Sequence, residues 1–158
     1  MIIVLDSVRS AHNVGSIFRT ADAVGVQKIY LCGVTPTPQD RFGRPSQRIA
    51  KVSLGAEHSV NWEHSPDVSI VIKKLQADSY RVIALEQQKG SSMIWDMDPV
   101  APDSKIALVL GSEVDGLSTA ALALADKTIE IPMHGKKESL NVSVAFGIAI
   151  YWLLRPRS

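Results

Sequence analysis

The sequence predicts an α/β fold, with a parallel sheet flanked by helices on both faces. Segments typical of strands alternate along the chain with segments typical of helices, an order that favours parallel strands joined by crossover helices. The strand-like segments are also continuous apolar runs, such as Ile2–Leu5 and Lys105–Leu110, which is typical of strands buried on both faces. Because the 158 residues contain no internal repeat and no linker, we expect a single domain over residues 1–158.

Each expected element has a local signal. In chain order, the first are an apolar strand at Ile2–Leu5, a helix of 3.6-residue spacing at Asn13–Val24, a strand at Lys28–Cys32, a Pro- and Gly-rich loop at Val34–Gln47 and a helical turn at Ser46–Lys51. The later ones are a helix at Pro66–Ala77, a strand at Arg81–Leu85, a loop at Gln87–Asp103, a strand at Lys105–Leu110, a helix at Thr119–Leu124, a strand at Thr128–Ile131 and a helix at Asn141–Leu154.

Composition excludes several classes of protein. Hydrophobic residues make up 46% and the formal net charge is +1, so nucleic-acid binding would depend on local patches and not on the overall field. The single cysteine, Cys32, cannot form an intrachain disulfide, and no Cys/His group has zinc-ligand spacing. Because Met1–Leu5 runs directly into polar residues, we expect no signal peptide, and the longest apolar run, Val142–Leu154, is too short for a membrane span. We expect a cytoplasmic protein with neither metal nor membrane segment.

The common nucleotide-binding fingerprints are missing. No G-x-G-x-x-G motif follows a strand, so a conventional dinucleotide site is not expected. The stretch Gly111–Ser118 has two glycines at P-loop spacing, but Leu117 stands where the phosphate-binding lysine would be. A ligand of this domain must therefore be bound in another way.

Three polar segments carry the candidate chemistry. Asn13 stands at an expected helix start, with Arg19 almost two turns further on. The turn Gly111–Glu113 follows a buried strand, at the carboxyl edge where open α/β sheets bind ligands, and glycine allows close backbone approach. Ser139 and Asn141 lie at the entry of the last helix, where free N–H groups favour polar ligands. Taken singly, each segment could equally be a helix cap or a solvated turn.

Together the three segments resemble the signature motifs of the SpoU/TrmH branch of the SPOUT RNA methyltransferases. The matching positions are Asn13 and Arg19, then Gly111, Glu113 and Gly116, and finally Ser139, Leu140 and Asn141. The resemblance extends over nearly the whole chain, and the S-L-N-V-S-V-A run that begins at Ser139 is its most specific part. It implies a SPOUT-type sheet whose C-terminal segment forms a trefoil knot, a feature that pattern alone does not predict.

The resemblance also implies an activity, which is S-adenosylmethionine-dependent methylation of a ribose 2′-hydroxyl in RNA. The implied catalytic residues are Arg19, Asn13, Glu113, Ser139 and Asn141. The implied cofactor-binding residues are Leu85, Glu86, Gly111, Ile131, Met133, Ser139 and Leu140. The family's proposed base is the arginine at position 19, but a guanidinium stays protonated. We therefore expect Arg19 to position the target and polarise its hydroxyl, held by a bidentate pair with Glu113.

A basic segment is the candidate RNA contact. It contains Arg41, Arg44, Arg48 and Lys51 without an acidic residue, and Phe42 lies among them. Flexible cations beside an aromatic ring suit phosphate contact and base stacking, although a solvated loop would look the same. Transfer RNA is the favoured substrate, with ribosomal RNA next.

The resemblance further implies a homodimer, and the helix face around Phe146, Ile150, Tyr151 and Trp152 is a candidate for its interface or for plain core. We expect no separate RNA-binding domain within the chain. Three alternatives stay open: a non-catalytic RNA-binding homodimer of the same fold, a SPOUT enzyme that methylates a base, and a small-molecule α/β binding module.

Overall fold

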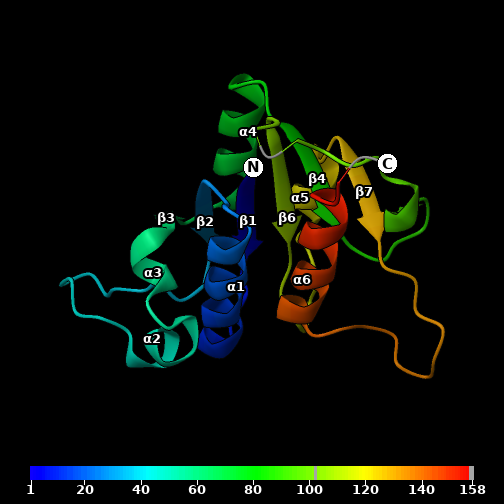
Figure 1. Cartoon of the computed structure of the whole chain (residues 1–158). Coiled ribbons are helices and arrows are strands. Elements are labelled where there is room, and N and C mark those ends of the chain that lie inside the picture. Colours follow the sequence, from blue (N-terminus) through cyan, green and yellow to red (C-terminus); the bar gives the residue numbers. More distant parts are fainter. Residues whose placement is uncertain (102, 157–158) are drawn as a thin grey trace.

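The computed structural model describes residues 1–101 and 103–156, and over these residues seven parallel strands form one sheet in the order β3-β2-β1-β6-β4-β7-β5 (Figure 1). The strands are β1 (Ile2–Asp6), β2 (Lys28–Cys32), β3 (Asn61–Ser65), β4 (Arg81–Leu85), β5 (Ser92–Met93), β6 (Ile106–Leu110) and β7 (Lys127–Glu130). The helices are α1 (Ala11–Ala23), α2 (Gln47–Ser53), α3 (Ala56–Ser59), α4 (Val68–Ala77), α5 (Thr119–Leu124) and α6 (Val142–Leu153).

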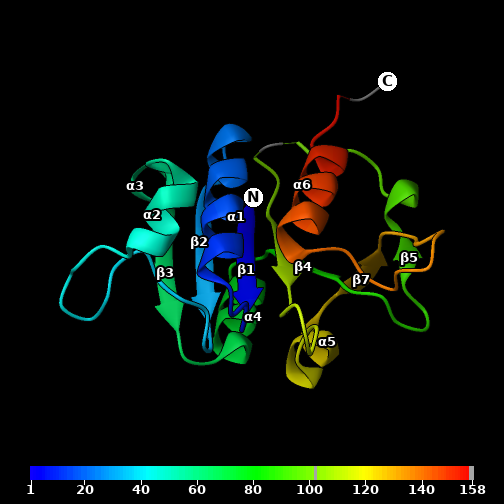
Figure 2. The same ribbon diagram turned by 90° about the horizontal axis from the view of Figure 1, so that it is seen from below.

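Helices cover both faces of the sheet, as predicted. Figure 2 shows α1, α2, α3 and α6 on one face and α4 and α5 on the other. Each face has its own apolar core, one between the sheet and the helices α1 and α6, the other under α4 and α5. The central strands β1 and β6 are buried along their whole length, which explains why their sequences are continuous apolar runs.

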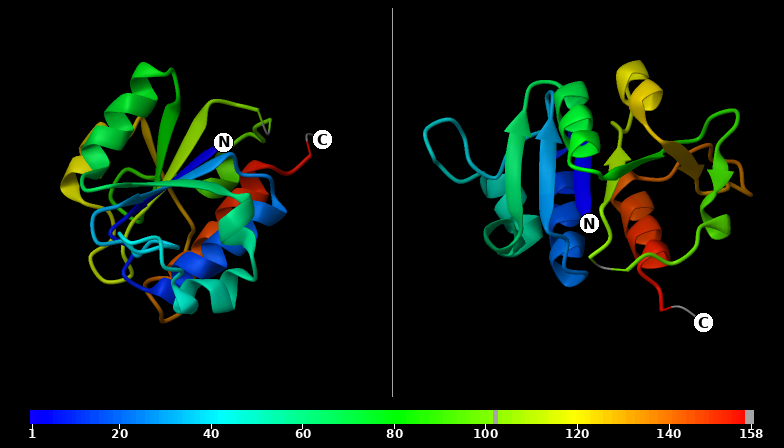
Figure 3. Two further views of the ribbon diagram at one scale, coloured as in Figure 1. Left: turned by 90° about the vertical axis from the view of Figure 1, so that its left-hand side faces the viewer. Right: turned by 90° about the horizontal axis from the view of Figure 1, so that it is seen from above.

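The strand order places the candidate site. From β1 the chain crosses through α1 to β2 on one side, whereas from β6 it crosses through α5 to β7 on the other side (Figure 3). The carboxyl ends of β1 and β6 therefore lie at a topological switch point, where ligands enter sheets of this kind. β4 and β7 run parallel to β6, so their carboxyl ends lie at the same edge of the sheet.

Both outermost strands were missed by the sequence prediction. β3 has only Ser65 buried, because it is an edge strand with solvent on one side, and its polar residues hide the signal. Trp62, which lies outside every predicted element, is part of β3. β5, at the other edge, is two residues long within the predicted loop Gln87–Asp103. The short helix α3 was also not predicted.

Two helices, α1 and α4, begin at residues other than those predicted, because their N-cap residues differ from the expected ones. Ser10 caps α1 by accepting a hydrogen bond from Asn13 N, so the helix begins at Ala11. Asp67 caps α4 through Ser69 N, which moves that start from Pro66 to Val68.

The C-terminal helix α6 packs one of its sides into the apolar core. Phe146 and Ile150 are fully buried, so of the four proposed interface residues only Tyr151 is well exposed, while Trp152 packs edge-on against Trp95. The segment before β6 holds the end of this helix, because Val100 N donates to Leu153 O at 2.7 Å. Among the described residues, no helix is long and apolar enough to cross a membrane. The trefoil knot stays a prediction, and residues 157–158 of the expected domain lie outside the described ranges.

Candidate active site

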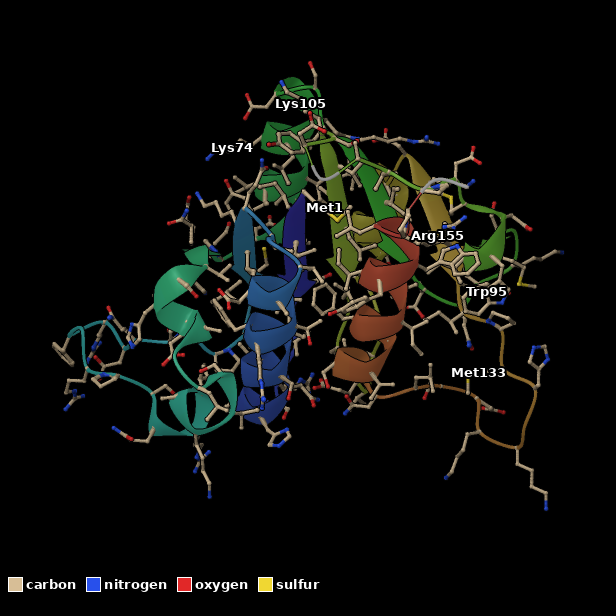
Figure 4. All side chains as sticks on the ribbon, in the orientation of Figure 1. Met1, Lys74, Trp95, Lys105, Met133 and Arg155 are labelled. Atoms are coloured by element: carbon tan, nitrogen blue, oxygen red, sulfur yellow. The ribbon has the colours of Figure 1, made fainter. Side chains whose placement is uncertain are left out.

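A cavity of about 340 Å³ opens at the carboxyl edge of β4, β6 and β7. Its lining includes Leu85, Glu86, Gly111, Ile131, Ser139 and Leu140, which are six of the seven predicted cofactor residues. The seventh, Met133, does not line the cavity and lies on the loop that leads away from β7 (Figure 4). The start of this loop is held beside the end of β4, because Gln87 Nε2 donates to Ile131 O at 3.1 Å. Segments distant in sequence thus form one pocket.

Gly111 is needed because the chain folds back on itself directly after β6. Ser112 and Gly116 pair through two backbone hydrogen bonds of 3.0 and 3.1 Å, which closes a tight turn. A Cβ on Gly111 would overlap the backbone of Gly116 and Leu117. The sequence predicted close approach of a ligand at Gly111, and the structure shows that the first close neighbour is the protein's own turn.

Two carboxylates at strand ends fix this turn. Glu86 follows β4 and accepts hydrogen bonds from Leu117 N at 2.8 Å and Gln87 N at 3.0 Å. A Cβ on Gly116 would collide with the same carboxylate, and Gly116 has a φ of +67°, so glycine is required twice over. Asp6, buried at the end of β1, accepts from Ser118 N at 3.0 Å. Glu86 is therefore both a wall of the cavity and a support of its turn.

One hydrogen-bonded chain joins the three polar segments. Asn13 is 93% buried on α1 (7% exposed) and donates through Nδ2 to Glu113 Oε1. Its Oδ1 accepts a bond of 3.0 Å from Asn141 Nδ2. Asn141 in turn caps α6, because its Oδ1 accepts from Ser143 N at 2.9 Å. The helix-cap explanation of Asn141 is therefore confirmed, and the same amide also joins the third polar segment to the first.

Arg19 lies outside this chain of hydrogen bonds. It lines a separate shallow hollow with His12, Arg48, Lys51 and Val52, on the surface that α1 and α2 share. The predicted ion pair of Arg19 with Glu113 is not formed among the described residues. The Glu113 carboxylate instead accepts from Asn13 and from Arg9 N.

Gly15 brings the basic residues of α2 to Arg19. A Cβ on Gly15 would lie 2.8 Å from Ile49 O and 2.9 Å from Val52 Cβ, so only glycine lets α2 cross α1 this closely. Arg48 and Lys51, expected on a loop or a single turn, are on α2 and lie beside Arg19 for this reason. The role of Gly15 could not be predicted from the sequence, because it depends on the tertiary contact between α1 and α2.

The two remaining predicted RNA contacts are on an exposed loop. The centre of the Phe42 ring lies 4.7 Å from the guanidinium carbon of Arg41 and 5.2 Å from that of Arg44. Arg44 forms an ion pair of 2.7 Å with Asp40, an acidic residue just outside the predicted basic segment. The pKa of Asp40 is lowered, mainly by the hydrogen bond from the Arg44 backbone N–H. The Arg44 guanidinium and the Phe42 N–H lower it further. Arg41 therefore carries more available charge than Arg44.

The chain matches the model of the SpoU rRNA methylase family over residues 1–151. It belongs to that family. Among its relatives, a 23S rRNA (guanosine-2'-O-)-methyltransferase from Ralstonia nicotianae is 33% identical over 160 residues, with 100% of this chain and 59% of the relative covered. A protein of the same description from Salmonella typhi is 30% identical, with 99% and 60% covered. The chain thus spans less than two thirds of the length of these relatives.

Solved SpoU structures have the same fold. The SpoU methyltransferase AviRb from Streptomyces viridochromogenes, crystallised with the cofactor AdoMet, superposes with a TM-score of 0.85 at 26% identity over 98% of this chain and 59% of its own. A TrmH/SpoU tRNA-modifying enzyme from A. aeolicus gives 0.83 at 30% identity, over 98% and 73%. A protein described for 2-OH methylation of C/U34 on tRNA gives 0.80 at 26% identity, over 98% and 93%.

The cavity of this SpoU-family chain is acidic. Its charged lining residues are Glu86, Glu113, Asp115, Glu130 and Glu138, and within the described part of the chain no Lys, Arg or His lines it. Asp115 is neutralised by an ion pair of 2.8 Å with Arg9. No group of three or more potential metal ligands is present among the described residues. An anionic ligand such as a dinucleotide would be repelled here, whereas a cationic one would be attracted.

Proposed function

We propose that this chain methylates a ribose 2′-hydroxyl of RNA with S-adenosylmethionine as methyl donor. The observation that carries the proposal is the hydrogen-bonded chain Glu113–Asn13–Asn141, which joins all three polar segments beside the cavity. The buried amide of Asn13 is held in one orientation by its two partners, which pre-organises this part of the site. The surrounding core of α1 is apolar and has no need for an amide of its own. Family membership and the AdoMet-bound relative point the same way.

The cavity fits the proposed cofactor. Its volume of about 340 Å³ lies in the range of small-ligand sites, and its acidic lining suits a cationic molecule. Gly111, Ile131 and Leu140 would hold the cofactor through backbone groups and apolar walls. When bound, S-adenosylmethionine would supply an electrophilic methyl group on a positively charged sulfonium, and its transfer to the ribose oxygen would leave a neutral thioether and pass the hydroxyl proton to water.

The protein's part is positioning, because this displacement needs its reacting atoms in line. Asn13, Glu113, Ser139 and Asn141 would orient the ribose at the mouth of the cavity. Arg19 keeps its proton at neutral pH and would bind a phosphate or polarise the hydroxyl, not remove its proton. Since Arg19 lines a hollow that shares no residue with the cavity, the RNA must reach both.

Transfer RNA is the proposed substrate and a cytoplasmic homodimer the proposed form. The tRNA proposal is supported by the relative described for tRNA methylation, of which the chain covers 93%, while other relatives are described for 23S rRNA. The exposed apolar side chains of Val144 and Tyr151 on α6 support an interface there. Sedimentation of the purified protein tests the dimer, and a monomer at micromolar concentration would contradict it.

The activity is tested by incubating the protein with methyl-labelled cofactor and either total tRNA or total rRNA, and digesting the RNA to nucleosides for mass spectrometry. We expect label on the ribose of a tRNA nucleotide. Label on a base would favour the base-methylating alternative, and label in rRNA would correct the substrate. RNA binding without any label would favour the non-catalytic alternative.

The predicted RNA contacts should differ in how much each contributes to RNA binding. The double variant Arg48→Ala/Lys51→Ala should weaken tRNA binding and reduce the slope of log affinity against log salt by about 1 to 2, because two phosphate contacts are lost. Arg44→Ala should have the smaller effect, since Asp40 already compensates its charge. Filter binding at several salt concentrations measures both.

Lys73→Ala/Lys74→Ala is the matched control, because it removes the same charge from α4 on the opposite face of the sheet. An equal loss of affinity in the control would show that only overall charge matters and would contradict a local RNA surface.

A further inference from the structure

Two carboxylates of the cavity are not used by the protein itself. Glu86 and Glu113 accept hydrogen bonds from backbone or amide groups, and Asp115 is paired with Arg9. Glu130 ends β7 and Glu138 lies on the loop before α6, and no ion pair or hydrogen bond to either side chain is present among the described residues. These two residues lie outside the three motifs, so the proposed chemistry does not require them.

Neither carboxylate forms an ion pair with a described cation. Lys136 and Lys137 precede Glu138 on the same exposed loop, but they do not line the cavity and make no ion pair with it. Both carboxylates therefore contribute negative potential to a pocket that has no lining cation to offset it among the described residues.

We infer that Glu130 and Glu138 make the cavity selective for S-adenosylmethionine over S-adenosylhomocysteine. This rests on the proposed cofactor. The two molecules share an ammonium and a carboxylate and differ by the methyl group and the positive charge of the sulfonium. Attraction to the ammonium is common to both, so it leaves the affinity ratio unchanged. Attraction to the sulfonium is present only before methyl transfer, so these carboxylates retain the donor and favour release of the neutral product.

The size of the effect follows from partial exposure. A carboxylate and a cation at a solvent-accessible site attract weakly, which corresponds to roughly a two- to fivefold change in affinity per carboxylate. Two such residues give a combined preference on the order of tenfold for the charged molecule at low salt. Added salt should reduce the preference, because exposed charges are screened.

The test is calorimetric titration of the purified protein with S-adenosylmethionine, S-adenosylhomocysteine and sinefungin, whose protonated amine places a positive charge near the position of the sulfonium. We expect the two cations to bind more tightly than S-adenosylhomocysteine. In Glu130→Gln/Glu138→Gln the preference should fall to within about twofold, with thermal melting showing that the variant folds. Asp98→Asn is the matched control, because it removes an exposed charge near the far end of α6.

Equal affinity of the wild type for all three molecules would overturn this inference alone. A double variant that weakens all three equally would also overturn it, since the carboxylates would then act only on the shared ammonium. Failure of every molecule to bind would overturn the proposed cofactor as well.

Discussion

Arg19→Ala is expected to lower the rate of methyl transfer by about 10²–10³-fold, the usual cost of removing one electrostatic contact to reacting groups. Cofactor affinity should stay within about twofold of the wild type, because Arg19 does not line the proposed cofactor cavity. Single-turnover kinetics at saturating RNA measures the first quantity, and calorimetric titration measures the second.

Arg48→Ala separates RNA binding from chemistry, since Arg48 lies in the same hollow but is not one of the motif residues. It should weaken RNA binding while leaving the rate at saturating RNA nearly unchanged. Near-wild-type turnover in Arg19→Ala would contradict the role assigned to this residue, and so would a matching loss of cofactor affinity.

Gly111→Ala is expected to abolish measurable cofactor binding. The added Cβ would overlap the backbone of Gly116 and Leu117, so the turn must open and Glu113 must leave its hydrogen bond with Asn13. We expect the free energy of unfolding to fall by about 1–3 kcal/mol, the typical cost of overpacking a closed site. Urea denaturation and calorimetric titration measure the two effects.

Gly135→Ala is the matched control on the loop between β7 and α6, because a Cβ there meets no atom within 4 Å. Its stability and cofactor affinity should be close to those of the wild type. Unchanged cofactor binding in Gly111→Ala would show that the turn tolerates the extra atom, and the steric account of this glycine would be wrong.

Much of the fold follows from local pattern. β6 is apolar along its whole length and β4 is apolar after Arg81, and the positions of both strands were predicted to within one residue. The edge strands β3 and β5 were not predicted, because a strand with one open side needs neither an apolar run nor length. The start of α1 was predicted two residues too late, because several polar residues near Ser10 could have served as its cap.

The sequence alone determined the α/β class, the family and the polar residues of the three motifs, because each depends on local patterns, which are apolar runs for the class and short motifs for the family. Only the tertiary structure decided which of them meet. Asn13 and Asn141 are 128 positions apart and share a hydrogen bond, whereas Arg19, six positions after Asn13, lies in a different hollow. The acidic character of the cavity was equally out of reach, because its carboxylates come from separate strand ends and loops that only parallel pairing brings to one edge.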